Sequence, residues 1–219
     1  YWEDALTNVK ELGQVDGILV GNMGTAHRLK DIQRIKLAGD ISLNIFNTLS
    51  FIVASNMGFD SIALSAEMTL RQIKQLEKPS GKPSVETAVY GRLPLMISEY
   101  CPVGCVEGGF CSSSRCSGCC SRGDYVLKDR TGMEFPVLCD NTTCRSTVLN
   151  SKPLFVPELA EELKQSGVSI LRLYIWDEKP DDIKKLVRLF RGEESIETEE
   201  VARKIRSLGF TKGHYIKGV

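Results

Sequence analysis

Short apolar runs alternate along most of the chain with stretches whose apolar residues recur at helical spacing, a pattern typical of β/α units. The first apolar run is bounded by glycines, and Gly39 and Gly58 separate this strand and helix pair from the second and the second from the third. The first third of the chain therefore predicts three consecutive strand and helix pairs. They are 16–20 with 25–37, 41–46 with 48–54, and 62–64 with 69–76.

The pattern resumes further along the chain, around a cysteine-rich stretch. Further apolar runs at 87–90, 93–97 and 169–176 predict strands, and helical spacing predicts helices at 156–165 and 181–190. The acidic and then basic order of 193–206 indicates one more, solvated helix.

Five or six such units indicate an α/β fold and a partial TIM-like (β/α) barrel, because a full barrel needs eight strands. We therefore expect 1–219 to form a single barrel-like domain, with residues 99–152 as a cysteine-rich metal-binding insertion. The chain begins with Tyr1 rather than Met, so we also expect it to be a fragment of a larger protein.

In such a barrel the working face is built from residues that follow the carboxyl ends of the strands. Glu67 is the candidate acid or base, and Arg92 or Arg145 is placed to bind an anionic group. The alternatives are an ordinary helix N-terminal acid for Glu67 and a structural donor for Arg145. Further candidate substrate-binding residues are Asn22, Asn47 and Ser65.

Composition gives no global pointer to a partner, since 28 Lys and Arg balance 28 Asp and Glu. No apolar run approaches the length of about 18 residues that a membrane span needs, and the N-terminus does not resemble a signal peptide. We expect a cytoplasmic, reducing setting and no membrane partner.

All eight cysteines lie between Cys101 and Cys144. Converging thiolates hold zinc or an iron–sulfur cluster, whereas a disulfide framework is typical of short secreted domains without a sufficient core. The sequence thus predicts a metal site, with disulfides as the alternative. The cysteines are Cys101, Cys105, Cys111, Cys116, Cys119, Cys120, Cys139 and Cys144.

Hydrolytic machinery has little support in the sequence. There are only two histidines, His27 and His214, and no HExxH pair. A nucleophile would need one of them as its base.

Several stretches together resemble peptidase family U32, the collagenase-like peptidases. The signature-like segment is VYGRLPLM at 89–96, which leads to Cys101. The likeness is closest to the C-terminal barrel portion of a long member. Other matching stretches are DGILVGNMG at 16–24, LNIFN at 43–47, LSAE at 64–67, CRS at 144–146, NSKP at 150–153 and TKGHY at 211–215.

The resemblance implies a 4Fe-4S cluster bound by four cysteines. Carried over residue by residue, the ligands are Cys101, Cys116, Cys120 and Cys144. Cys119 could replace Cys120, and Cys139 could replace Cys144, because this chain has more cysteines than the family pattern. Spacing alone also fits zinc, which stays the alternative metal.

Members are named peptidases, yet several are implicated in oxygen-independent hydroxylation of RNA or of a quinone precursor, with prephenate implicated as hydroxyl donor. The resemblance implies an iron–sulfur hydroxylase that acts on RNA or another aromatic or heterocyclic substrate. The alternatives are a collagenase-like peptidase and a noncatalytic zinc-stapled binding module. Implied partners are RNA, a small-molecule cosubstrate and the remainder of the parent chain.

Overall fold

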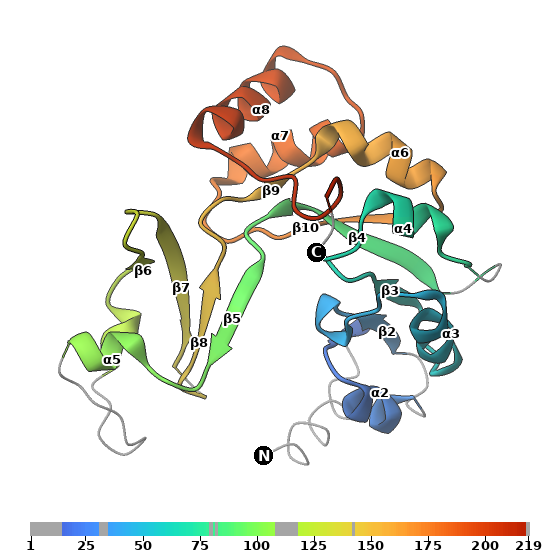
Figure 1. Ribbon diagram of the computed structural model, residues 1–219, viewed down its shortest axis with the longest axis horizontal. Helices are drawn as coiled ribbons and strands as arrows, with labels where there is room; N and C mark the ends of the chain where they lie inside the picture. The colour runs from blue at the N-terminus through green and yellow to red at the C-terminus, as the bar shows by residue number, and fades with distance from the viewer. Residues whose placement is uncertain are drawn as a thin grey trace. The chain divides into compact units, whose positions relative to one another are not determined.

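The computed structural model describes residues 15–30, 35–78, 81, 83–107, 118–141 and 143–217 (Figure 1). Contacts between Cα atoms divide the chain into two compact units. Unit 1 falls within Tyr1–Val89, Val156–Leu173 and Lys212–Val219, and unit 2 within Tyr90–Phe155 and Tyr174–Thr211.

Unit 1 is built on a sheet with the strand order β1-β2-β3-β4-β10. Neighbouring strands from β1 to β4 run parallel, with Ala38 beside Ser61 and Ala63 beside Glu86. The strands are β1 (Gly17–Val20), β2 (Lys36–Gly39), β3 (Ser61–Ala63), β4 (Ser84–Gly91), whose last two residues belong to unit 2, and β10 (Ile170–Leu173).

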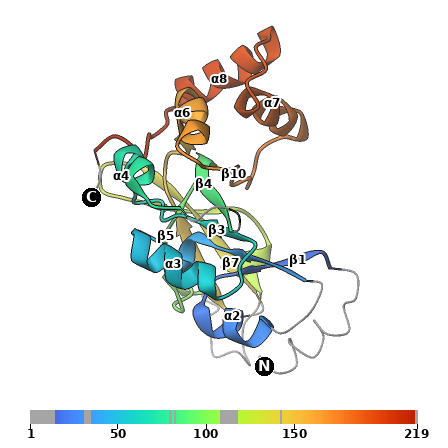
Figure 2. The same cartoon turned by 90° about the vertical axis from the view of Figure 1, so that its right-hand side faces the viewer.

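Helices connect these strands, as the β/α pattern predicts. Helix α2 contacts β1 and α3 contacts β3 (Figure 2). The helices of unit 1 are α2 (Met23–Leu29), α3 (Thr48–Asn56), α4 (Leu70–Gln75) and α6 (Ala160–Gln165), with 3₁₀ turns η1 (Ile41–Leu43) and η3 (Pro157–Leu159).

The core of unit 1 lies between the sheet and these helices. Phe51 of α3 and Ile73 of α4 are fully buried, as are Ile62 of β3 and Val89 of β4. Strands buried on both faces need continuous apolar runs, and β3 is buried at all three of its residues.

An ion triad in unit 1 joins strands β10 and β4 to Asp40, the residue that follows β2. Arg172 of β10 donates from Nη1 to Asp40 Oδ1 at 2.6 Å and from Nε to Glu86 Oε2 at 2.9 Å. The Glu86 side chain is only 6% exposed and that of Arg172 15%. The Arg172 charge thus compensates a carboxylate that the sheet has removed from water.

The C-terminal segment of unit 1 is anchored by Tyr215. Its hydroxyl donates to the carbonyl of Ala88 and lies 2.7 Å from Thr87 Oγ1, which donates to it. Burial raises the pKa of the Tyr215 phenol to about 12, against the opposing effect of the Thr87 hydrogen bond. The neutral phenol is therefore the form that the fold stabilises.

We expect Tyr215→Phe to flatten the loss of stability at high pH. An unfolded tyrosine titrates near pH 10, so the contribution of Tyr215 is present below about pH 10 and lost as pH rises toward 12. The wild type should lose about 2–3 kcal/mol more than the variant over this interval. Urea unfolding followed by circular dichroism measures the free energy of unfolding at each pH. An equal dependence on pH in the wild type and the variant would contradict the prediction.

Unit 2 contains a four-stranded antiparallel sheet with the order β5-β8-β7-β6 (Figure 1). A tight turn from Asp129 to Met133 joins β6 and β7, where Met133 N–H donates to Asp129 Oδ1 at 2.9 Å. The strands are β5 (Pro94–Ser98), β6 (Tyr125–Lys128), β7 (Glu134–Asp140) and β8 (Arg145–Leu149).

The remaining elements of unit 2 flank this sheet in sequence. They are α5 (Pro102–Val106), the 3₁₀ turn η2 (Cys119–Ser121), β9 (Leu154–Phe155), α7 (Pro180–Phe190) and α8 (Ile196–Leu208). Strand β9 pairs antiparallel with the end of β4, with Phe155 beside Tyr90.

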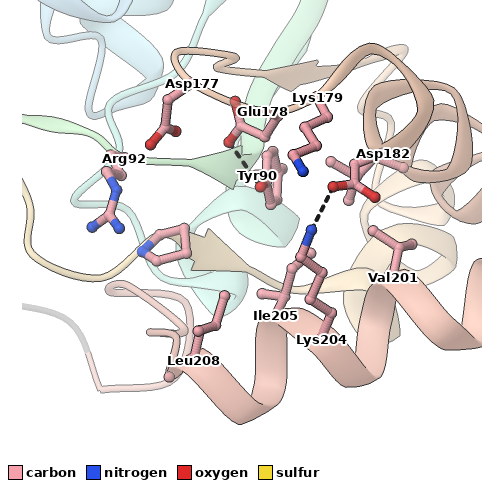
Figure 3. A pocket seen from close by; sticks show the side chains of 13 residues that line it. Tyr90, Arg92, Asp177, Glu178, Lys179, Asp182, Val201, Lys204, Ile205 and Leu208 are labelled. Carbon is pink, nitrogen blue, oxygen red and sulfur yellow. Dashed lines mark hydrogen bonds and ion pairs between the residues drawn. The ribbon is translucent and has the colours of Figure 1, made fainter.

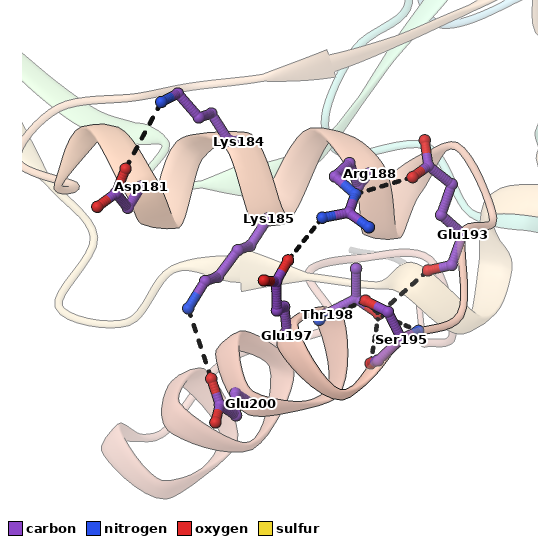
Figure 4. A network of polar contacts seen from close by, with 9 residues as sticks. All are labelled: Asp181, Lys184, Lys185, Arg188, Glu193, Ser195, Glu197, Thr198 and Glu200. Atoms are coloured by element: carbon purple, nitrogen blue, oxygen red, sulfur yellow. Dashed lines mark hydrogen bonds and ion pairs between the residues drawn. The ribbon is translucent and has the colours of Figure 1, made fainter.

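Helices α7 and α8 pack as a hairpin tied by surface ion pairs (Figure 4). Arg188 bridges Glu193 at 2.8 Å and Glu197 at 2.6 Å, and these partners raise the pKa of its guanidinium. Ser195 begins α8 with a capping box that includes Thr198. The acidic start and basic end of this helix agree with the solvated helix predicted from the sequence.

The mixed α/β class with a parallel sheet is confirmed, but a barrel is not shown. Two boundaries differ from the prediction. Leu37 lies in β2 rather than at the end of a helix, and the predicted strand 41–46 is a 3₁₀ turn followed by a single bridge at Ile45. The cause is nonlocal: Leu37 exchanges hydrogen bonds with Asp60, from another segment.

Among the described residues, no helix has the length and apolar content that crossing a bilayer requires.

Candidate functional site

The small sheet of unit 2 organises the described cysteines. Cys139 on β7 lies opposite Ser146 on β8, and Ser146 lies opposite Ser98 on β5. Because β5 ends at Ser98, the chain reaches Cys101 three residues beyond this row. Strand pairing therefore brings Cys101 and Cys139 toward the same end of the sheet.

The environment of Cys139 shows that two other cysteines are near. Burial is the main cause that raises the pKa of its thiol, and the charges of Cys101 and Cys119 raise it further. Ser146 Oγ, 3.8 Å from the sulfur, acts in the opposite direction. The Cys139 thiol of β7 thus lies within electrostatic range of Cys101, at the β5–α5 junction, and of Cys119, in η2.

Cys101 is positioned by the start of α5. It is the N-cap residue, followed by Pro102 at the first helical position, and its Sγ accepts the N–H of Gly104 at 3.2 Å. Backbone N–H donors of this kind are common partners of metal-bound thiolates. Cys105, one turn later, is exposed, and its hydrogen bond is the main cause that raises the pKa of Tyr100.

The turn η2 holds a second pair of sulfurs. Cys119 is 2% exposed, and its carbonyl accepts a hydrogen bond of 2.8 Å from the hydroxyl of Tyr125. Cys120 is half-buried beside it. Helix α5 packs against η2, so the two cysteine-bearing segments are neighbours within unit 2.

Cys144 occupies a strained position. Its φ is 56°, in the left-handed region that residues other than glycine seldom adopt. It sits in the turn between β7 and β8, where Thr143 Oγ1 donates to Asp140 Oδ2 at 2.5 Å. Such strain concentrates at functional sites, so Cys144 is a ligand candidate on backbone grounds as well.

The described cysteines do not by themselves complete a metal site. No three Cys, His, Asp or Glu side chains within the described ranges come together as ligands of one ion. The predicted metal-binding insertion is thus not seen there; the described residues of 99–152 form α5, η2 and strands β6 to β8. Cys111 and Cys116 lie outside the described residues.

Two of the predicted polar residues of unit 1 are helix N-caps. Asn22 follows β1 and caps α2 by accepting Thr25 N–H at 2.8 Å. Asn47 caps α3 through a capping box with Ser50. Both side chains therefore have a structural role in addition to the predicted one.

Ser65 and Glu67 follow β3. Ser65 is 4% exposed and its hydroxyl accepts the N–H of Glu67 at 3.3 Å, whereas Glu67 itself is exposed. The buried hydroxyl thus shapes the turn that presents the Glu67 carboxylate.

The two predicted arginines lie in unit 2. Arg145 begins β8 and pairs with Glu99 at 3.0 Å, on the surface. Arg92 follows β4 and donates to the carbonyls of Asn150, at 3.0 Å, and Ser151. Arg92 thus ties the end of β4 to the segment after β8.

Arg92 also lines a cavity of about 230 Å³ that the sequence did not reveal (Figure 3). The loop after β10 approaches the end of β4 here, because Gly91, with φ 110°, has no Cβ to clash with Tyr174. The Tyr90 hydroxyl donates to Glu178 Oε1 at 2.8 Å across this approach.

A model of one protein family, described as peptidase family U32, matches residues 2–216. The chain belongs to peptidase family U32. No curated protein and no solved structure matches it.

The described residues of neither unit assemble a thiol protease centre. The described cysteines belong to unit 2, whereas His27 and His214 belong to unit 1. His27 lies in the last turn of α2. A Cys nucleophile activated by a His base is therefore absent from the described part of each unit.

Proposed function

We propose that this U32 chain binds a 4Fe-4S cluster through Cys101, Cys116, Cys120 and Cys144 and uses it in oxygen-independent hydroxylation. The observation that carries the proposal is the strand pairing that brings Cys139 of β7 and Cys101, three residues after β5, toward one end of the small sheet, with Cys119 near enough to raise the pKa of the Cys139 thiol. Soft thiol donors gathered from separate segments are the chemistry that an iron–sulfur cluster requires.

Further features of the described cysteines support the proposal. Every described cysteine is a free thiol, which argues against a disulfide framework. Cys101 already receives an N–H donor, and Cys144 is held in a strained turn. Because Cys101 and Cys119 both affect the pKa of Cys139, Cys119 and Cys139 stay alternative ligands to Cys120 and Cys144.

When bound, the cluster supplies electron transfer or an open coordination position. The overall change converts C–H of the acceptor to C–OH, while a hydroxylated carboxylate donor, of which prephenate is the example, exchanges its C–OH for C–H. The acceptor is thereby oxidised by two electrons and the donor reduced by two.

The chain's own residues would bind and orient these molecules. Arg145 is adjacent to Cys144, and its exposed pair with Glu99 is weak enough to be exchanged for a donor carboxylate. Arg92 would bind an anionic group in the same way.

The activity is tested with the anaerobically purified chain, RNA and prephenate. We expect mass spectrometry of the digested RNA to show the addition of one oxygen atom, dependent on prephenate and retained without dioxygen. Arg145→Met should lower this yield more than Lys128→Met, a matched loss of an exposed cation that pairs with Glu134.

Peptide cleavage by protein that carries no iron would instead support the peptidase that the family description names. Tightly bound zinc without either activity would support a noncatalytic binding module.

A further inference from the structure

The cavity beside Arg92 has the composition of a small-molecule site (Figure 3). Helices α7 and α8 supply an apolar wall from Leu186, Val201, Ile205 and Leu208, and Tyr90 adds its ring. Binding pockets for small molecules combine such a wall with a few fixed polar groups. The volume of about 230 Å³ is below the range for drug-sized ligands, so the occupant is small.

The charges around the cavity balance. Three cations, Arg92, Lys179 and Lys204, face three carboxylates, Asp177, Glu178 and Asp182. A lining without net charge gives no advantage to a strongly anionic or cationic ligand. It favours a ligand whose own charges also cancel.

Several of these charges are already engaged by the protein. Lys204 pairs with Asp182 at 2.6 Å, and the Glu178 carboxylate accepts from the Tyr90 hydroxyl and the Trp176 N–H, each at 2.8 Å. The two contacts of Glu178 fix the loop that also carries Asp177 and Lys179, its neighbours in the sequence.

Asp177 and Lys179 are those two neighbours, and Figure 3 shows them on either side of Glu178. Neither forms an ion pair with another described residue. The Asp177 carboxylate and the Lys179 ammonium therefore line the cavity without an ion-pair partner among the described residues.

We propose that this cavity binds a free amino acid with an apolar side chain. Its ammonium would bind Asp177, its carboxylate would bind Lys179, and its side chain would pack against Ile205 and Leu208. No cysteine lines the cavity, so the proposal does not depend on metal binding.

The test is calorimetric titration of the purified chain with L-leucine, N-acetyl-L-leucine and L-leucinamide. The two analogues each lack one charge of the zwitterion. We expect L-leucine to bind at least about tenfold more tightly than either analogue. Asp177→Asn should lower the affinity for L-leucine but leave the affinity for N-acetyl-L-leucine unchanged. Lys179→Met should lower the affinity for L-leucine but leave the affinity for L-leucinamide unchanged.

Lys184→Met is the matched control, because Lys184 lies on α7 but does not line the cavity. It should leave the affinity for L-leucine unaltered. Three results would overturn the proposal: no binding of L-leucine at about 10 mM, equal affinity for the blocked analogues, or the same loss in the control variant as in Lys179→Met.

Discussion

Cys101→Ser is expected to abolish cluster binding without harming the fold. Serine is an equally good N-cap residue, so its hydroxyl will accept the Gly104 N–H and α5 will still begin at Pro102. The hard oxygen ligand will not replace the thiolate on iron. We expect iron bound per chain to fall more than about tenfold, as measured on anaerobically purified protein.

Cys105→Ser provides the matched control. Cys105 lies on the same short helix, is exposed and is outside the proposed ligand set. Its iron content should equal that of the wild type. If Cys101→Ser retains its iron, or if both variants lose it equally, Cys101 is not a specific ligand.

Arg172→Met is expected to lower the free energy of unfolding by about 3–5 kcal/mol. The change leaves the Glu86 carboxylate, 6% exposed, without its compensating charge inside the sheet of unit 1. Methionine is of similar length and apolar, so the loss reflects an uncompensated charge rather than a cavity. Urea denaturation followed by circular dichroism measures the change.

Two further variants separate charge from packing. Adding Glu86→Gln to Arg172→Met should recover part of the lost stability, because the buried carboxylate is then neutral. Lys74→Met breaks the exposed pair with Glu162 and should cost less than about 1 kcal/mol. A small effect of Arg172→Met, or a larger loss in the double variant, would show that the triad does not stabilise the sheet.

Local signals explain which elements could be predicted from the sequence. Helices α3, α4 and α8 each begin with a capping box, from Asn47, Thr69 and Ser195, that specifies the start without help from distant residues. The sequence places a helix where β2 begins, because β2 is specified by its pairing with β1 and β3 and the local spacing of apolar residues does not report such pairing.

The antiparallel sheet was missed although a signal for it exists. The β-branched, aromatic and aliphatic residues of YVLK at 125–128 and EFPVLCD at 134–140 favour strands, and Asp129 to Gly132 between them form a turn of hairpin type. The many cysteines of 99–152 instead indicate a metal-binding loop. Strand pairing and metal ligation are compatible, since the sheet is what brings Cys139 toward Cys101.

The candidate site was predictable only in its chemistry. The cysteine cluster and the arginines could be read from residue types, but the roles of Asn22 and Asn47 as caps needed the helix starts. The cavity depends on Tyr90 meeting Glu178, which is 88 residues away in sequence. No short-range pattern encodes that contact.

The central claim is that cysteines of unit 2 hold an iron–sulfur cluster. It is tested most directly by measuring iron, acid-labile sulfide and zinc in the wild-type chain purified without dioxygen. We expect about four iron and four sulfide per chain, with broad visible absorption and little zinc. A colourless protein with one zinc per chain, or with no bound metal after reconstitution with iron and sulfide, would contradict it.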